Sequence, residues 1–179
     1  MARALAQRFA AGIVLACVSA ALASSALAAP NRPTVALSSL ERGVLTDINA
    51  FRRAHHLSAL RLSAPLTSAA VTHTQEMAVQ GYFAHESADG SLFWKRIRSF
   101  YPSTPWTFWS VGENLLWSSP DVGASQALQL WLNSPEHRAN LMNPQWREIG
   151  VASVHATAAP GVFHGLDVTI VTTDFGARH

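Results

Sequence analysis

Two histidines and one glutamate, His85, Glu113 and His137, are the residues of this chain best suited to chemistry. Two imidazoles and a carboxylate form a ligand set that proteins use for catalytic zinc, with one position left for water. Zinc in such a site lowers the pKa of the bound water and supplies a hydroxide for hydrolysis. The three residues come from remote segments, so their spacing does not itself indicate a metal. We expect them to meet in one cleft, where they either bind a metal or hydrogen-bond a ligand.

The segment around His137 determines the state of its imidazole. Residues 122–132 predict a helix, with Ser119-Pro120 supplying the N-cap and the first position. Ser134-Pro135 then ends that helix and begins another, because proline disfavours helix at the preceding residue and suits a first turn. His137 falls in the opening turn, where the helix dipole disfavours the imidazolium. A neutral imidazole is what a metal ligand or a hydrogen-bonding group requires.

His85 and Glu113 each also have a structural interpretation. His85 follows two aromatic residues in a loop, where functional groups concentrate, but a loop histidine can simply bond to the backbone. Glu113 lies between apolar runs, so its carboxylate must be paired, metal-bound or protonated. A structural salt bridge or a helix cap would satisfy it equally well.

Residues 1–28 are typical of a secretory signal peptide. Arg3 and Arg8 form a positive region, residues 9–23 an apolar run, and Ala26-Leu27-Ala28 a cleavage site. Cleavage leaves a lead segment at residues 29–38 and lowers the basic count from 13 to 11, against 11 acidic residues. The mature chain would then have no net charge, which argues against a nucleic-acid partner.

Cys17 lies inside the apolar run, so a chain cut after Ala28 carries no thiol. Such a protein has neither disulfides nor a cysteine nucleophile, and no serine stands in a Gly-x-Ser-x-Gly elbow. A lipid anchor at Cys17 is the alternative, although Leu15 fits that pattern poorly. We expect an exported monomer without a transmembrane span, secreted or periplasmic.

Helices are predicted first along the remaining chain. Residues 40–55 form one, with Ser38 and Glu41 as a capping box, and its polar residues Asn49 and Arg52 are expected on a solvated flank. Residues 64–80 form a second, in which the inward-facing His73 is expected to be a hydrogen-bonded core residue.

A short helix at residues 91–99 and an aromatic segment at 100–110 come next. The helix is expected to turn its apolar residues inward, and the aromatic segment to pack across the core. The basic residues of the helix are expected on a solvated outer face: Lys95, Arg96 and Arg98.

Strands are predicted last, at residues 148–154 and 166–175, both rich in β-branched residues. Helices followed by a strand pair predict an α+β layered domain at residues 39–179. No internal repeat and no second domain are evident.

Several short motifs stand in an order that resembles a known family. They are Asn49 and Arg52, Phe83-Ala84-His85, Gly112-Glu113-Asn114, Trp131-x-x-Ser134-Pro135-x-His137-Arg138-x-Asn140 and Glu148-Ile149-Gly150-Val151. The set in this order is specific, and it spans residues 40–175. It resembles the bacterial SCP-like branch of the CAP superfamily, which comprises cysteine-rich secretory, antigen 5 and pathogenesis-related proteins.

The resemblance implies a three-layer α-β-α sandwich with a central antiparallel sheet and a cleft of two histidines and two acidic residues. It assigns His85 and His137 as the histidines and Glu113 as the first acid. The disulfides of the eukaryotic members are missing.

The second acid of the family departs from the pattern. Eukaryotic members place a glutamate three residues after the helix tryptophan, where this chain has Ser134 after Trp131. Asp174 in the final strand, or Glu136, could supply an acid instead. The motifs also suggest residues that support the cleft: Asn114, Trp131, Arg138 and Asn140.

Three functions are compatible with this resemblance. The first is an extracytoplasmic binding module whose cleft takes a divalent cation such as Zn²⁺, since enzymatic activity is not general in the family. The second is a metal-dependent hydrolase of peptide or cell-envelope material, with His85, Glu113 and His137 as ligands or acid–base groups. The third is a lipid or sterol carrier, suggested also by the aromatic residues at 101–109. The ligand, whether small molecule, lipid, peptide or cell-envelope polymer, is open at this point.

Overall fold

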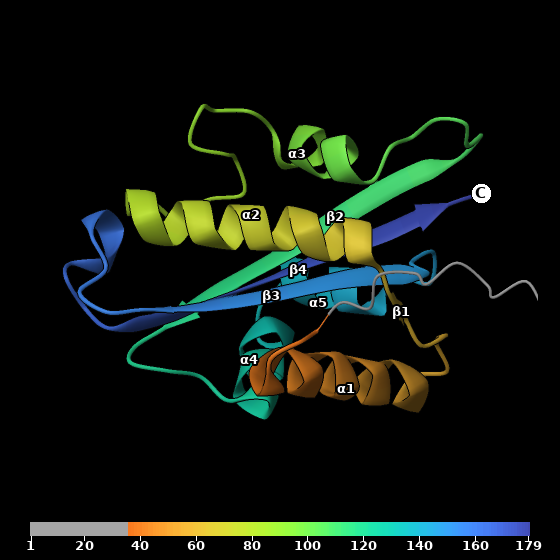
Figure 1. The fold of residues 1–179 in the computed structure, drawn as a ribbon. Coiled ribbons are helices and arrows are strands. Elements are labelled where there is room, and N and C mark those ends of the chain that lie inside the picture. The colour runs from red at the N-terminus through yellow and green to blue at the C-terminus, as the bar shows by residue number, and fades with distance from the viewer. Residues whose placement is uncertain (1–35) are drawn as a thin grey trace, which may run out of the picture. The chain divides into compact units, whose positions relative to one another are not determined.

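The computed structural model describes residues 36–179. The predicted signal peptide with Cys17, and the lead segment up to residue 35, lie outside the described residues. Figure 1 shows helices gathered around a sheet of four strands. The helices are α1 (Ser39–Ala54), α2 (Ala64–Gln80), α3 (Phe93–Phe100), α4 (Ala124–Leu132) and α5 (Pro135–Met142), and a 3-10 turn, η1, spans Gly161–Phe163. Within residues 36–179 no helix is both long and apolar enough to cross a membrane.

The strands are β1 (Arg61–Leu62), β2 (Trp109–Ser118), β3 (Glu148–Ala156) and β4 (Val168–Arg178), in the order β1-β3-β4-β2. β4 is antiparallel to both β2 and β3. The two-residue β1 instead runs parallel to β3, with Arg61 beside Glu148. The sheet is therefore mixed, and the prediction of an antiparallel sheet was wrong for this edge strand.

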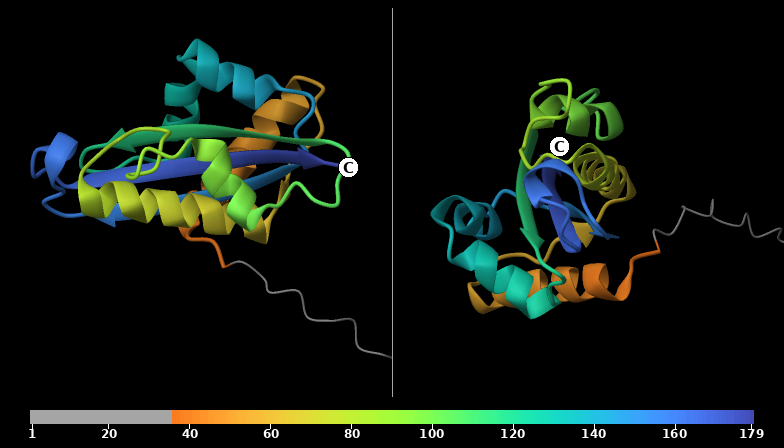
Figure 2. Two further views of the ribbon diagram at one scale, coloured as in Figure 1. Left: turned by 90° about the horizontal axis from the view of Figure 1, so that it is seen from above. Right: turned by 90° about the vertical axis from the view of Figure 1, so that its left-hand side faces the viewer.

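Helices cover both faces of the sheet, which confirms the three-layer α-β-α sandwich. Figure 2 shows α2 and α3 on one face and α1, α4 and α5 on the other. Side chains of β4 alternate between the two layers. Val171 and Phe175 join the core beneath α1, α4 and α5, while Thr172 faces α2 and bonds to Thr74.

α2 lies directly on the sheet because glycine stands beneath it. A Cβ at Gly150 of β3 would come within 2.1 Å of the Leu66 backbone carbon. The helix ends at Gly81, whose left-handed backbone (φ 72°) suits a residue without a side chain. The predicted bounds of this helix are confirmed. Ser63 occupies its N-cap position without a side-chain hydrogen bond.

The start of α4 and the presence of β2 differ from prediction. α4 begins at Ala124 with Gly123 as N-cap, so the predicted start at residue 122 and the cap at Ser119-Pro120 were wrong. The preceding residues cross from the end of β2, and buried Val122 packs into the core on the way. β2 itself was not predicted, because the polar Glu113 and Asn114 interrupt its hydrophobic pattern although both are buried.

Asn49 and Arg52 are structural residues of α1, and the solvated flank expected for them was wrong. Arg52 is fully buried and donates to the carbonyl oxygens of Ser58 (2.9 Å), Leu141 (2.8 Å) and Asn143 (3.0 Å). The Asn49 amide bonds to both backbone groups of Leu60. Both side chains thus pair backbone groups of loops and of the last turn of α5 that no helix or strand satisfies.

The aromatic segment is divided between the core and the surface, so the packing expected for it holds only in part. Tyr101 is fully buried, and the Trp109 indole N–H donates to its carbonyl oxygen at 2.9 Å. Trp106 is 44% exposed. The Arg178 guanidinium lies 3.7 Å from the Tyr101 ring centroid and 5.2 Å from that of Trp106.

Candidate functional site

His85 and Glu113 form the centre of the candidate site. Glu113 belongs to β2, and only 1% of its side chain is exposed. His85 lies in the loop between α2 and α3, and 47% of its side chain is exposed. Its Nδ1 is 2.8 Å from Glu113 Oε1. A carboxylate only accepts hydrogen bonds, so Nδ1 is the donor and Nε2 is left for other partners.

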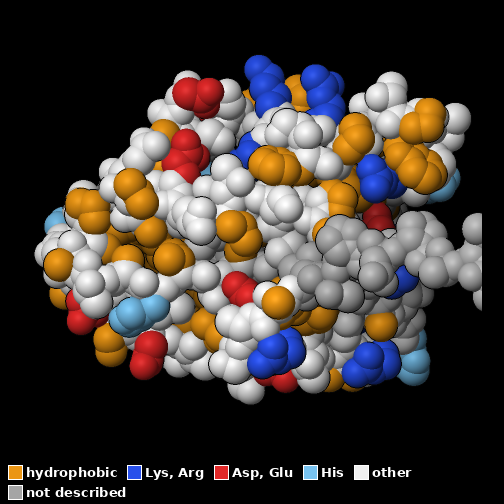
Figure 3. All heavy atoms as spheres, in the orientation of Figure 1, with side chains coloured by type: hydrophobic (Ala, Val, Ile, Leu, Met, Phe, Trp, Pro, Cys, Tyr) orange, Lys and Arg blue, Asp and Glu red, His pale blue; other side chains and the backbone are white. Residues whose placement is uncertain are grey.

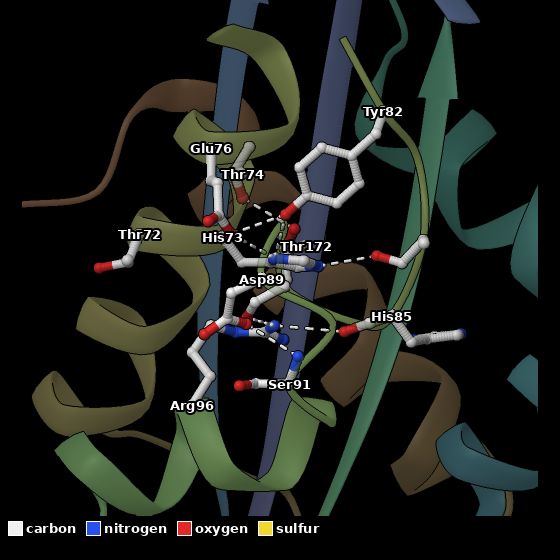
Figure 4. Close-up of polar contacts among 12 residues, drawn as sticks. Thr72, His73, Thr74, Glu76, Tyr82, His85, Asp89, Ser91, Arg96 and Thr172 are labelled. Carbon is white, nitrogen blue, oxygen red and sulfur yellow. Dashed lines mark hydrogen bonds and ion pairs between the residues drawn. The ribbon is translucent and has the colours of Figure 1, made fainter. Parts of the chain in front are cut away.

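Arg96 of α3 holds the second oxygen of Glu113. Its Nη2 donates to Glu113 Oε2, and its Nη1 donates to the His85 carbonyl oxygen (3.2 Å) and to Ser87 Oγ (3.1 Å). Figure 4 shows this side chain reaching from α3 to the His85 backbone. Arg96 therefore joins the carboxylate, the histidine and the loop between them.

The outward position expected for Arg96 was wrong, since only 6% of its side chain is exposed. Its neighbours Lys95 and Arg98 do lie outside, where each approaches the Trp94 ring, and basic side chains project from the α3 end of the molecule in Figure 3. A signal was available in the sequence. Arg96 stands three residues after Phe93 and one before buried Ile97, on the inward side of the helix.

An asparagine pair fixes α5 against β2. Asn140 Nδ2 donates to the Glu113 carbonyl oxygen (3.0 Å) and to Asn114 Oδ1 (2.9 Å). Asn114 Nδ2 in turn donates to the His137 carbonyl oxygen at 3.0 Å. Gly112 permits this approach, because a Cβ there would lie 3.0 Å from Asn140 Oδ1 and 2.9 Å from Trp146. The support predicted for Asn114 and Asn140 thus has a definite geometry.

His137 lies in the first turn of α5, as predicted, and its side chain is free of protein hydrogen bonds among the described residues. Partial burial lowers its pKa, and the charge of His85 lowers it further. The neutral form is thus favoured as expected, with burial as the main cause and the neighbouring His85 charge as the second. The two histidines flank neighbouring residues of β2, since Glu113 bonds to the His85 ring and Asn114 bonds to the His137 carbonyl oxygen.

The pKa of His85 moves the other way. Its hydrogen bond to Glu113 raises the pKa, and burial opposes this only in part. The site therefore holds one histidine that favours the charged form beside one that favours the neutral form. Environments that separate two pKa values in this way distinguish a proton donor from a proton acceptor.

Asp174 lies behind the site, directly across from Glu113 in the pairing of β2 with β4. It is fully buried, and neither of its oxygens has a hydrogen-bond partner among the described residues. Burial, with the Glu113 charge, raises its pKa well above the usual value, so the protonated acid is favoured. Asp174 therefore adds no second carboxylate charge.

The other expected residues have different roles. Ser134 Oγ donates to Glu136 Oε2 (3.3 Å), and neither residue bonds to His85 or Glu113 in the described part of the chain. Arg138 is exposed. Trp131 is a buried anchor of α4 whose indole donates to the Leu115 carbonyl oxygen at 3.0 Å.

His73 is the core histidine expected of it. It is fully buried, its Nε2 bonds to the Ala84 carbonyl oxygen at 2.9 Å, and desolvation lowers its pKa. Beside it, Tyr82 donates to Glu76 at 2.6 Å, as Figure 4 shows. These contacts hold the chain that leads to His85.

A divalent metal does not fit these residues as they stand. Within residues 36–179, no three His, Cys, Asp or Glu side chains are placed to hold a metal ion. Both oxygens of Glu113 are engaged, one by His85 and one by the Arg96 cation. Of the three predicted metal ligands, only His85, through Nε2, and the His137 ring have nitrogen atoms left for a metal.

The sequence matches the CAP family, described as the cysteine-rich secretory protein family, over residues 45–172. The chain belongs to this family. Its CAP domain is 28% identical over 120 residues to the uncharacterized protein YkwD of Bacillus subtilis, covering 67% of this chain and 44% of YkwD. The chain thus spans less than half of that relative's length.

Solved CAP-like structures agree with the fold. An outer surface protein of Borrelia burgdorferi has a TM-score of 0.62 at 21% identity, over 77% of this chain and 92% of that one. An extracellular protein of Bacillus anthracis containing an SCP domain has a TM-score of 0.57 at 25% identity, over 80% and 45%. The CAP match includes His85, Glu113 and His137 but ends before Asp174.

Proposed function

We propose that this CAP-domain protein is an extracytoplasmic binding module that holds its ligand at His85 and His137. The observation that carries the proposal is the division of labour in the site. Glu113, Arg96 and the two asparagines bond to other parts of the protein, whereas His85 Nε2 and the His137 ring are left for a ligand. The surface and extracellular relatives support the location.

The chemistry of the two rings favours a ligand with anionic oxygen. A charged His85 offers an N–H donor at Nε2, and a neutral His137 offers one donor and one acceptor. A carboxylate or phosphate group of a peptide or cell-envelope polymer matches such a pair. The hydrolase hypothesis has less support, because it requires a zinc-bound water and Glu113 has no oxygen free for zinc.

Histidine ring NMR signals of the mature protein, titrated with inorganic phosphate and separately with acetate, test this function. We expect the ring signals of His85 and His137 to shift and then saturate as the anion is added. The Kd should be in the millimolar range, because a single anionic group is a small ligand. In His85→Gln the His137 signal should no longer shift saturably with the anion, and in His137→Gln the same should hold for the His85 signal. His155, which bonds to Thr169, is the control signal. Shifts at His85 and His137 no larger than at His155 would contradict the proposed binding. Cell fractionation tests the proposed location separately, and a cytoplasmic pool of protein that still begins at Met1 would contradict it.

Lipid carriage is the second candidate, and a groove between α1 and α4 favours it. The groove has a volume of about 450 Å³, within the range of small-molecule sites. Its lining is largely apolar and includes Ala50, Phe51, Leu128 and Leu132. In the aromatic segment first considered for this role, Tyr101 is buried and Trp106 is 44% exposed.

Native mass spectrometry of purified protein tests lipid carriage. We expect a co-purifying lipid in the wild type and its loss in Ala50→Trp, which fills the groove. Gln126→Trp, on the exposed surface of α4 and outside the groove lining, is the matched control. Wild-type protein free of lipid would rule this candidate out.

A further inference from the structure

We propose that Arg96 is a built-in cation that takes the place of a divalent metal on Glu113, so that this site binds its ligand without a metal. The proposal deepens the function proposed above, because it assigns Glu113 to the positioning of His85 and leaves ligand contact to the histidines. It rests on the contacts of one buried guanidinium.

The Arg96 guanidinium is committed at three acceptors. Nη2 donates to Glu113 Oε2, and Nη1 donates to the His85 carbonyl oxygen and to Ser87 Oγ. The Arg96 side chain is 6% exposed and the Glu113 side chain 1% exposed, so water competes little with their pairing. A planar guanidinium can serve several acceptors at once, which a lysine ammonium does less well.

The Glu113 carboxylate has its counter-charge without a metal. One guanidinium faces one carboxylate, and His85 contacts the remaining carboxylate oxygen. A metal ion on Glu113 would have to displace Arg96 or His85. Displacing Arg96 would leave a buried guanidinium without its counter-charge, which is strongly unfavourable.

Arg96 also explains how an exposed loop presents a histidine in a fixed position. It holds the His85 backbone directly and the His85 ring through Glu113. A metal would organise the same residues from the ligand side. Here Arg96 of α3 holds these residues from within the protein, so Nε2 of His85 stays available to a ligand.

Zinc titration calorimetry on the folded mature protein tests the proposal. The wild type should bind zinc at most weakly, because Glu113 offers no oxygen to a metal while Arg96 is present. Arg96→Gln should bind zinc at least about tenfold more tightly than the wild type, the scale of change expected around a metal site. The double variant Arg96→Gln/Glu113→Gln should lose that gain. Arg98→Gln, an exposed neighbour on the same helix, should behave as the wild type.

Two results would overturn the proposal. One is tight, saturable zinc binding by the wild type that His85→Gln abolishes, which would mean that the site takes a metal despite Arg96. The other is a folded Arg96→Gln that gains no zinc affinity. If Arg96→Gln does not fold, the zinc titration of the wild type still decides. The phosphate titration is independent of zinc, so failure of the binding function would show there and not in the calorimetry.

Discussion

At the scale of single residues, the site depends on how one buried carboxylate is satisfied. The Glu113 side chain is accommodated inside the protein because His85 and Arg96 each bond to one of its oxygens. The sequence predicted His85, Glu113 and His137 as a group, since their residue types and motifs identify them. It did not predict Arg96, because a basic residue close to two others is typical of a solvated surface unless its helical face is considered.

The hydrogen bond to Glu113 sets the protonation of His85. Glu113→Gln should lower the pKa of His85, because a neutral amide no longer favours the imidazolium. Histidine ring NMR shifts followed against pH measure this. The His155 ring signal is the control in the same sample. A His85 midpoint that Glu113→Gln leaves in place would show that the pair does not form in solution.

The same pKa shifts give stability a pH dependence of known sign. His85 has a raised pKa in the folded protein, so its contribution is fully present below the unfolded-state pKa of about 6.5. That contribution is lost as the pH rises through the folded-state pKa. His137 has a lowered pKa, so its contribution is present above the unfolded-state value and is lost as the pH falls through the folded-state pKa.

At the scale of elements, β2 and α5 are joined by the asparagine pair and thereby place Glu113 and His137 together. The sequence predicted α5 and its start correctly, because Ser134-Pro135 is a strong helix boundary. It missed β2, because the buried residues Glu113 and Asn114 are polar and interrupt the apolar pattern of the strand. It also began α4 too early, because the local signals at Ser119-Pro120 favour a helix that the crossing from β2 to the core prevents.

Removal of the Asn140 side chain should loosen this junction. Asn140→Ala leaves the Glu113 carbonyl oxygen and Asn114 Oδ1 without a donor, at a cost of about 1–3 kcal/mol in the free energy of unfolding. Urea unfolding measures the loss. Asn133→Ala, at an exposed position at the end of α4, is the control and should change stability less. Equal stability of the two variants would remove the asparagine pair as the link between β2 and α5.

At the scale of the whole molecule, layered packing was predictable and the edge of the sheet was not. Periodic apolar residues in the helices and β-branched residues in the last strands predict an α+β layered domain, and the family resemblance implies the α-β-α sandwich. The parallel β1 has two residues, too few to carry a pattern. Arg52 belongs to this scale too, since its buried guanidinium joins α1 to the loop before β1 and to the end of α5.

Arg52→Met should destabilise the whole domain by about 3 kcal/mol or more, because three carbonyl oxygens lose a charged donor. Thermal and urea unfolding should report the same loss. Arg53→Met, at the next and exposed position, is the control and should stay near wild type. A small effect at residue 52 would mean that water replaces the guanidinium at these carbonyls.

The most direct test of a shared site at His85 and His137 is the pKa of His137 in wild type and in His85→Gln, measured from its ring NMR signal. The pKa of His137 should lie below its usual value in the wild type, and it should rise in His85→Gln because a neighbouring positive charge is removed. His155→Gln should leave it unchanged. If His85→Gln also leaves it unchanged, the two histidines do not share a site, and the proposed binding function is contradicted.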